Sequence, residues 1–458
     1  MKKVRFSEVS ILSGTITAPS SKSFSHRLFF LALISPTSLF LTNILTAGVI
    51  DYTAEACKRL GLQILPDSEN TIKCIPPDII KSNRMEIDCG NSGTTVRFLT
   101  GLSLVISGEI ILSGEFFKQN RPISPMLKAM QPLGTRYKLQ EHRLIVETPI
   151  LKSNLVKIPG NISSQFISGL LYGIIGLCFR PKAVLQKKFL EHEFIIETTT
   201  PLVSYPYLEL TQKIFQECGF NFYIVQLPSG CLRIVVPMRN FSRFNKTSFI
   251  VPGDYSAISP ILTASVLFGK PPLLIKNLPP NKIQADQEFL SILQKMGVEI
   301  EIIDTQVQLL SNLTTQSHTL DRLLIDCANH PDLFPVLCVL GAYTKTTTFL
   351  TNIDHIRFKE SNRVDFMVDL LSQFGVQIEM IENSVHILGN SAIHLYANHN
   401  IIGVFDHRVL MALCVFALGL SYNGYHLTIE NVNRIADSYP FFFDDLRNLG
   451  GKFTLEGI

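Results

Sequence analysis

Six stretches of the sequence are apolar on every side and long enough to form a helix. Each follows a short polar cluster, and the clusters begin near residues 20, 91, 161, 254, 330 and 406. A helix without a polar face is typical of one that is buried all round. The runs that we predict to be such helices read SFSHRLFFLALIS, TTVRFLTGLSLVIS, QFISGLLYGIIGL, ISPILTASVLFG, FPVLCVLGAY and VLMALCVFALGL.

Between these runs lie six amphipathic segments, and each ends in a glycine that is followed by alternating β-type residues. Glycine just past a helix end is the usual left-handed cap. The steps between the glycines are 73, 85, 78, 78 and 75 residues, for Gly61, Gly134, Gly219, Gly297, Gly375 and Gly450. Regular helix–strand alternation in an ordinary α/β protein is the alternative explanation. The near-constant spacing favours six copies of one unit, which could form two domains of three.

The composition narrows the class of protein. Hydrophobic residues make up 46% of the 458 and charged residues only 17%, which excludes a disordered chain. The formal net charge of +3 is too small for a protein that tracks nucleic-acid phosphates. Nine scattered cysteines without a CxxC pair predict a reducing, cytoplasmic setting with neither a disulfide framework nor a metal site. We expect no signal peptide and no membrane span.

The polar clusters carry the candidate chemistry, because each would stand at the N-terminus of a buried helix, where backbone N–H groups favour anions. Taken singly, each cluster is explained equally well by a helix cap or a surface loop. Together they offer two carboxylates, Asp332 and Glu360, as base and acid. They also offer seven cations, which gathered near one cleft would trap an anion. These cations are Lys22, Arg27, Arg97, Arg121, Lys359, Arg363 and Arg408.

In order along nearly the whole chain, the clusters resemble the 5-enolpyruvylshikimate-3-phosphate (EPSP) synthase family. The matching motifs are SKSFSHR, GNSGTTVR, RPI, SSQF, LVSYPY, GDYS, HPD, RFKESNR and DHR. The resemblance implies an α/β protein with a two-domain inverse α/β barrel-like fold, of the enolpyruvyl transferase type. It has six βαβαββ repeats, three per domain. The N-terminal domain would span residues 21–250, on the shikimate 3-phosphate side. Residues 1–20 and 251–458 would form the C-terminal domain, on the phosphoenolpyruvate and acid/base side.

The family transfers the enolpyruvyl group of phosphoenolpyruvate to the 5-hydroxyl of shikimate 3-phosphate, so the resemblance implies these substrates. The implied catalytic residues are Lys22, Asp332 and Glu360. Those implied to bind phosphoenolpyruvate are Lys22, Asn91, Gly93, Arg121, Gln165, Arg363 and Arg408. Those implied to bind shikimate 3-phosphate are Lys22, Ser23, Arg27, Ser163, Ser164, Gln165, Ser204, Tyr207, Asp332 and Lys359. No cofactor, metal, nucleic acid or membrane is implied, and we expect a monomer.

Two positions depart from the family pattern. Asp437 stands where the family has a lysine that contacts phosphoenolpyruvate, and a carboxylate pointing inward there would repel a phosphate. We expect either that Asp437 points away or that Arg434 takes over the positive charge. His355 stands where some members place an asparagine, which affects one contact to shikimate 3-phosphate.

Two other functions are weighed against this one. The sister enolpyruvyl transferase that acts on UDP-N-acetylglucosamine usually has a cysteine in the loop before its Arg-Pro, and residues 114–120 contain none. Its Lys-Asn near the start is Lys22-Ser23 here. A non-catalytic binding protein is the second alternative. The presence of Lys22, Asp332 and Glu360 argues against it, because binding alone does not need an acid–base set.

Overall fold

The chain divides into two compact units in the computed structural model. Unit 1 consists of Met1–Ser21 and Pro252–Ile458, and unit 2 consists of Lys22–Val251. Unit 2 is therefore one continuous segment, inserted between the two segments of unit 1. The structure describes residues 2–119, 121–180, 193–239, 241, 243–280, 283–313, 320–389, 399–401 and 404–457.

Unit 2 contains three four-stranded sheets in the described residues, all with the same order of pairing. The two strands at one side of each sheet are parallel, and the next two pairings are antiparallel. The first sheet has the order β14 (Ser248–Ile250), β3 (Leu39–Thr42), β5 (Thr71–Ile75) and β4 (Gln63–Ser68). The second has β6 (Lys81–Asp88), β7 (Ser107–Ser113), β9 (Arg143–Glu147) and β8 (Arg136–Leu139). The third has β10 (Leu155–Ile158), β11 (Glu193–Thr198), β13 (Leu232–Pro237) and β12 (Tyr223–Gln226).

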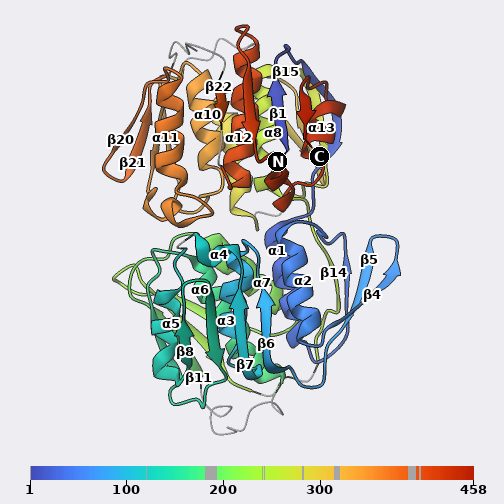
Figure 1. Cartoon of the computed structure of the whole chain (residues 1–458), viewed down its shortest axis with the longest axis vertical. Helices are drawn as coiled ribbons and strands as arrows, with labels where there is room; N and C mark the ends of the chain where they lie inside the picture. The colour runs from blue at the N-terminus through green and yellow to red at the C-terminus, as the bar shows by residue number, and fades with distance from the viewer. Residues whose placement is uncertain are drawn as a thin grey trace. The chain divides into compact units, whose positions relative to one another are not determined.

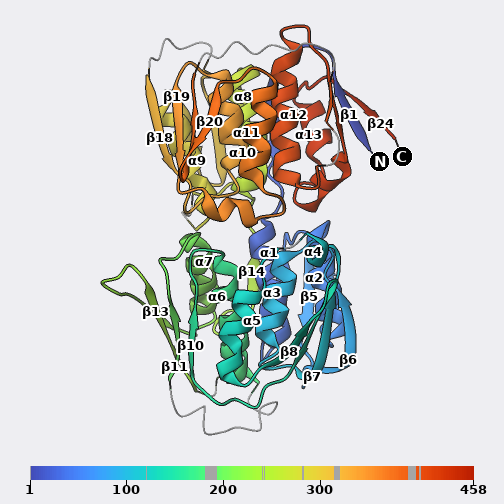
Figure 2. The ribbon, with the colours of Figure 1, turned by 60° about the vertical axis from the view of Figure 1, so that its left-hand side comes forward.

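Unit 1 repeats this arrangement with three further sheets in the described residues. The first is β2 (Leu12–Thr17), β15 (Gly269–Lys276), β17 (Gln306–Leu309) and β16 (Ile300–Ile303). The second is β18 (Arg322–Asp326), β19 (Thr347–Thr351), β21 (Ser384–Ile387) and β20 (Ile378–Ile381). The third is β22 (His399–Ile401), β23 (Leu427–Glu430), β1 (Lys3–Phe6) and β24 (Thr454–Glu456). Figure 1 and Figure 2 show β1 together with the last segment of the chain, with both chain ends in unit 1.

The six apolar runs form the buried helices that the pattern predicts. In unit 2 they are α1 (Lys22–Ile34), α3 (Gly93–Leu102) and α6 (Ser164–Phe179); in unit 1 they are α8 (Tyr255–Phe268), α10 (Phe334–Tyr343) and α12 (His407–Ser421). Every residue of α12 is buried, and so is every residue of α6 except Gln165. Within each unit the three buried helices contact one another (Figure 2), so they form its core.

Six amphipathic helices complete the repeats. They are α2 (Val49–Arg59), α5 (Ser124–Met130), α7 (Tyr205–Glu217), α9 (Glu288–Lys295), α11 (Arg363–Gln373) and α13 (Phe442–Asn448). All six predicted cap glycines have a positive φ, between 80° at Gly375 and 104° at Gly450. Shorter helical pieces are α4 (Glu115–Lys118), η1 (Gln131–Leu133), η4 (Ala285–Gln287), η5 (Asp354–Phe358) and η6 (Val432–Asp437).

Helices α3 and α6 approach each other more closely than side chains would allow, because glycines line their contact. A Cβ atom on Gly101 would lie 2.0 Å from the carbonyl oxygen of Gly169, and one on Gly173 would lie 2.1 Å from the carbonyl oxygen of Gly101. Backbone therefore packs on backbone at these positions. This close packing places residues near the start of α3 within reach of residues at the start of α6.

The expectation of a two-domain α/β fold built from six repeats is confirmed. The sheets and their helices give the order βαβαββ, and in each unit one repeat is completed by a strand from the other end of that unit's sequence, β14 in unit 2 and β1 in unit 1. No helix among the described residues is both long and apolar enough to cross a membrane.

Candidate active site

In unit 2, α1 begins at Lys22 and presents the first group of predicted residues. Arg27, one turn along, is buried and ties α1 to α7. Its Nε donates to Thr211 Oγ1 at 2.9 Å, its Nη2 to the Tyr207 carbonyl at 2.9 Å and its Nη1 to the Ser23 carbonyl at 3.0 Å. Burial lowers the pKa of Arg27 from 12.5 to about 10, so the guanidinium stays positive at neutral pH. The structure thus brings together the predicted residues Ser23, Arg27 and Tyr207.

Ser204 precedes α7 and has two unusual properties. Its backbone is left-handed, with φ 56° and ψ 40°, a conformation that is uncommon for any residue but glycine, asparagine or aspartate. Its hydroxyl is buried and has no hydrogen-bond partner among the described residues. Strain together with an unsatisfied buried hydroxyl is typical of a position kept for a ligand.

A second group lies at the loop before α3. Arg121 donates through Nη1 to the Asn91 carbonyl at 2.8 Å and to Asn91 Oδ1 at 3.3 Å, and its guanidinium carbon lies 5.1 Å from the ring centre of Phe116. A Cβ atom on Gly93 would lie 2.7 Å from Arg121 Nη2. A side chain at position 93 would therefore displace the guanidinium from this place. The structure therefore brings together the predicted residues Asn91, Gly93 and Arg121.

A third group forms where α3 packs on α6. Ser163 caps α6 by accepting from the backbone N–H of Gln165 at 3.3 Å, and Ser164 is the buried first residue of the helix. Arg97 donates through Nη1 to Gln165 Oε1 at 2.6 Å and through Nη2 to the Pro122 carbonyl at 3.0 Å. The sequence showed Arg97 as a cation near the site, but its role in holding Gln165 was missed.

Unit 1 contains a denser cluster around Arg363. This side chain is fully buried, and it meets three carboxylates. Nε donates to Asp406 Oδ2 at 2.8 Å, Nη1 to Asp332 Oδ1 at 2.7 Å and Nη2 to Glu360 Oε2 at 2.9 Å. Nη2 also reaches Asp406 Oδ1 at 3.3 Å and Nη1 the Pro331 carbonyl at 3.4 Å, so all five N–H donors are used.

The carboxylates of this cluster keep Arg363 protonated. Burial alone would lower the pKa of Arg363, but Asp406, Asp332 and Glu360 together hold it well above its usual value. Asp332 and Glu360 keep 18% of their side-chain surface exposed, whereas Asp406 is fully buried. The two predicted acid–base residues are therefore held at separate nitrogens of one guanidinium and remain accessible.

Asp406 is the functional residue of unit 1 that sequence reasoning missed. Besides its two bonds to Arg363, it accepts from Ser361 Oγ at 3.1 Å and caps α12 by accepting from the backbone N–H of Arg408 at 2.9 Å. A signal was present, because Asp406 opens the DHR motif at the start of a buried helix. That position predicts a cap, and it gives no indication of a partner 43 residues earlier in the chain.

Arg408 completes the cluster. Its Nε lies 3.6 Å from Asp332 Oδ2, and its Nη2 lies 4.0 Å from Asp254 Oδ1 at the cap of α8. Nε and Nη1 are buried and make no hydrogen bond within the described residues. Of the predicted unit 1 residues, Asp332, Glu360, Arg363 and Arg408 are thus gathered at one place.

Lys359 follows η5, which also carries His355. His355 is buried, and burial followed by the charge of Lys359 lowers its pKa from 6.5 to about 3. The backbone of Asn352 and the charge of Asp332 oppose this shift. The ring is therefore neutral at physiological pH, next to two predicted substrate-binding residues.

Arg434 and Asp437 lie together on η6. Arg434 Nη1 is 3.9 Å from Asp437 Oδ2, and its guanidinium carbon is 5.9 Å from the ring centre of Phe405. The Asp437 carboxylate therefore has a cation beside it.

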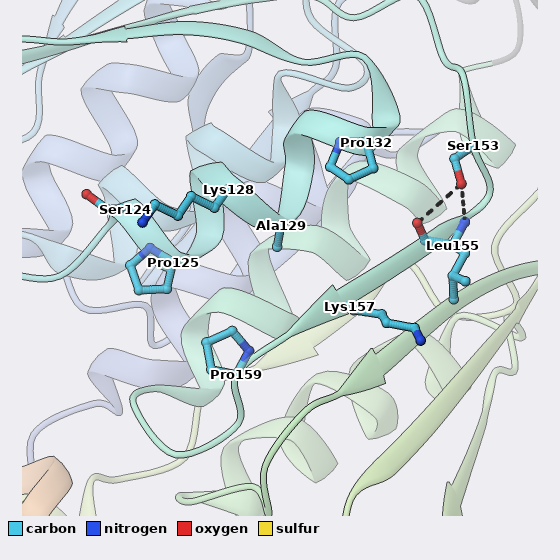
Figure 3. A pocket seen from close by; sticks show the side chains of 9 residues that line it. All are labelled: Ser124, Pro125, Lys128, Ala129, Pro132, Ser153, Leu155, Lys157 and Pro159. Carbon is cyan, nitrogen blue, oxygen red and sulfur yellow. Dashed lines mark hydrogen bonds between the residues drawn. The ribbon is translucent and has the colours of Figure 1, made fainter.

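A hollow in unit 2 contains none of the candidate residues. Figure 3 shows it between α5 with η1 and strand β10, where it is lined by Lys128, Lys157 and three prolines among others. Lys157 lies 3.8 Å from Glu197. Among the residues that the structure describes, no group of three or more His, Cys, Asp or Glu side chains could hold a metal ion.

Comparison with known proteins gives a consistent result. The family model described as EPSP synthase (3-phosphoshikimate 1-carboxyvinyltransferase) matches residues 7–446. Proteins named 3-phosphoshikimate 1-carboxyvinyltransferase from Methanococcus maripaludis and Clostridium acetobutylicum are each 30% identical to this chain. The alignments cover 97% of this chain and 98% of the first protein, and 96% of both chains for the second. A solved EPSP synthase from Acinetobacter baumannii has the same fold, with a TM-score of 0.74 at 19% identity over 100% of both chains.

Proposed function

The chain belongs to the EPSP synthase family, and on this premise we propose how its residues carry out the family's reaction. It is a transferase that moves the enolpyruvyl group of phosphoenolpyruvate to the 5-hydroxyl of shikimate 3-phosphate, which gives EPSP and inorganic phosphate. The step belongs to the shikimate pathway, which leads through chorismate to the aromatic amino acids.

The chemistry sets three requirements. In the addition, the 5-hydroxyl oxygen forms a bond to C2 of phosphoenolpyruvate, its proton passes to a base, and the methylene carbon C3 receives a proton from an acid. In the elimination, the tetrahedral ketal phosphate loses a proton from C3 as the bond from C2 to the phosphate oxygen breaks. Cations must compensate the charge of both substrates throughout.

The cluster around Arg363 is the observation that carries the assignment. We assign Asp332 as the group that orients and deprotonates the 5-hydroxyl, and Glu360 as the group that exchanges a proton with C3. Arg363 holds both carboxylates at fixed nitrogens, and their exposed edges leave room for substrate. Arg363 and Arg408 are assigned to phosphoenolpyruvate. Because all five donors of Arg363 are used, an arriving anion takes one from Asp332 or Glu360.

Residues of unit 2 are assigned to the same two substrates. Lys22 contacts both and assists proton transfer. Phosphoenolpyruvate is bound by Asn91, Gly93, Arg121 and Gln165. Shikimate 3-phosphate is bound by Ser23, Arg27, Ser163, Ser164, Gln165, Ser204 and Tyr207, together with Asp332 and Lys359. The unsatisfied hydroxyl of Ser204 and the neutral partners of Arg27 support this assignment.

For the departure at position 437, we propose that Arg434 takes over the positive charge. The ion pair between Arg434 and Asp437 supports this, because it compensates the carboxylate that replaces the usual lysine.

We also propose a cytoplasmic enzyme, since none of the nine cysteines, all of them buried, forms a disulfide. We further propose that it acts as a monomer, because one chain supplies every assigned group.

One assay tests the function. Phosphate release is measured with phosphoenolpyruvate and shikimate 3-phosphate, and separately with UDP-N-acetylglucosamine as the acceptor. We expect release with the first acceptor only, and we expect it to be lost in Asp332→Asn. The matched control is Asp321→Asn, an exposed carboxylate of the same unit. Binding without release would indicate the non-catalytic alternative, and release with the nucleotide sugar would indicate the sister transferase.

A further inference from the structure

Four buried side chains of unit 2 form a continuous chain of hydrogen bonds. His26 Nδ1 lies 2.7 Å from Thr53 Oγ1, Thr53 Oγ1 lies 2.6 Å from Thr95 Oγ1, and Thr95 Oγ1 donates to Ser92 Oγ at 2.6 Å. The four residues come from α1, α2, α3 and the cap of α3, and each is at most 3% exposed. None of them belongs to the predicted site.

The direction of these bonds is fixed by counting protons. The hydroxyl proton of Thr95 goes to Ser92, so Thr95 can only accept from Thr53. The hydroxyl proton of Thr53 is then used, so the ring nitrogen of His26 must be the donor to Thr53. Burial lowers the pKa of His26 well below 6.5, and the charges of Lys22 and Arg27 add to this. The ring is therefore the neutral tautomer with its proton on Nδ1.

The chain of hydrogen bonds ends at Ser92, and the hydroxyl proton of Ser92 is not used within this chain. Ser92 Oγ accepts twice, from the Thr95 hydroxyl at 2.6 Å and from the Thr95 backbone N–H at 3.1 Å. Two accepted bonds make a hydroxyl a stronger donor, because successive hydrogen bonds polarise one another. No acceptor for this proton exists among the described residues, although the side chain is almost fully buried.

Ser92 lies between two residues assigned to phosphoenolpyruvate. Asn91 on one side holds Arg121 through its carbonyl and its side-chain oxygen. Gly93 on the other side leaves space for the guanidinium of Arg121. The Ser92 hydroxyl thus belongs to the same loop as two residues assigned to phosphoenolpyruvate. An anionic oxygen bound at this loop is an acceptor suited to its proton.

We propose that the Ser92 hydroxyl is a further binding residue for phosphoenolpyruvate, and that His26, Thr53 and Thr95 are positioning residues that orient its proton. This inference rests on the proposed function, because it uses the same substrate at Asn91, Gly93 and Arg121. It assigns a purpose to a buried polar chain that otherwise occupies space that apolar side chains could fill.

The test is a double-mutant cycle read by steady-state kinetics on the full-length protein. Ser92→Ala is expected to raise the KM for phosphoenolpyruvate about tenfold, the value of one hydrogen bond to a charged group, and to leave the KM for shikimate 3-phosphate within about twofold. Thr95→Val, which keeps the shape and removes the hydroxyl, is expected to raise it about threefold. Thr95→Ser, which keeps the hydroxyl, is expected to keep the wild-type KM for phosphoenolpyruvate. In the Ser92→Ala background, Thr95→Val has no further effect.

Thr100→Val is the matched control, because Thr100 is also buried on α3 and its hydroxyl bonds only to the Val96 carbonyl. It should leave both KM values unchanged. If Ser92→Ala folds poorly, Ser92→Gly replaces it, since glycine keeps most of the cap. An unchanged KM in the Ser92 variant, or an equal effect of Thr95→Val with and without Ser92, overturns the proposal. Absence of phosphate release by the wild type would instead overturn the proposed function.

Discussion

Arg27 of unit 2 and Arg363 of unit 1 are held in opposite ways. Arg27 donates to the Thr211 hydroxyl and to the carbonyls of Tyr207 and Ser23, all of which are neutral. In unit 1, Arg363 meets three carboxylates and Arg408 lies near two. Arg27 and Arg363 are both buried, so the difference between them lies in charge rather than in solvent access.

This difference assigns distinct work to the two arginines. Arg27, with its neutral partners, keeps its charge available, and an anionic substrate is the partner that compensates it. Arg363, which meets three carboxylates, has its charge already compensated, and besides binding substrate it places Asp332 and Glu360. Arg27 is accordingly suited to binding an anionic group, and the Arg363 cluster combines binding with proton transfer.

Removing a carboxylate from unit 1 is expected to have the largest effect. Asp332→Asn should lower kcat by roughly 1000-fold, because an amide cannot accept the proton of the 5-hydroxyl. The KM for phosphoenolpyruvate should change by less than about threefold, since the amide oxygen still accepts from Arg363. Steady-state kinetics would measure both. A loss confined to KM would mean that Asp332 binds substrate and does not transfer a proton.

Next in size is Asp406→Asn, which weakens the fully buried anchor of Arg363. We expect the kcat/KM for phosphoenolpyruvate to fall about 100-fold and the free energy of unfolding to fall by about 3 kcal/mol, because a buried pair loses one partner. Kinetics and urea unfolding would measure these. Ser361→Ala, which removes only a neutral donor to Asp406, is the control and should cost little. Equal effects of the two variants would contradict an anchoring role.

In unit 2, Arg97→Lys tests whether the two hydrogen bonds of Arg97, to Gln165 and to the Pro122 carbonyl, require a planar guanidinium. Lysine keeps the charge but cannot reach Gln165 and the Pro122 carbonyl together, so we expect KM for both substrates to rise about tenfold. Arg136→Lys, at an exposed surface pair, is the control. Unchanged KM values in Arg97→Lys would show that charge alone suffices there.

A smaller effect is expected on η6. Arg434→Ala should raise the KM for phosphoenolpyruvate about fivefold, and Asp437→Lys should lower it about threefold, because the second change adds a cation where the first removes one. If both variants keep the wild-type KM, residues 434 and 437 do not set substrate binding.

The last prediction concerns the pH dependence of stability rather than kinetics, and it depends on His355. The folded pKa of about 3 lies below the unfolded value of 6.5, so the unfolded chain binds a proton first as the pH falls. This lowers stability between pH 6.5 and 3 by up to about 1.4 kcal/mol per pH unit. His355→Asn should unfold with a flatter pH dependence in that range, measured by urea titration at several pH values. An unchanged slope would place His355 in contact with water.

The sequence predicts more of the fold than of the site. Apolar runs and cap glycines are local signals, so the six buried helices and the glycines with positive φ could be predicted from them. The contacts of Arg97 with Gln165 and of Arg363 with Asp406 join residues 68 and 43 positions apart. They depend on how α3 packs on α6 and on how α11 begins beside α12, and no local pattern encodes that. The motifs predict which residues lie at the starts of helices. The hydrogen-bond partners of these residues are set by how the helices pack, which the motifs do not show.

Insertion of one unit into the other has a consequence for how the protein is made. During synthesis, all of unit 2 leaves the ribosome before β23 and β24 are made. Strand β1 therefore has neither of its pairing strands until the end of synthesis. The two joints meet in a small bridge, where Ser20 pairs with Gly253 and the Ser21 N–H donates to the Pro252 carbonyl at 2.8 Å. Cutting out residues 22–251 therefore leaves ends that already touch, and a linker of two or three glycines should rejoin them. Each half could then be produced and studied as a protein of its own.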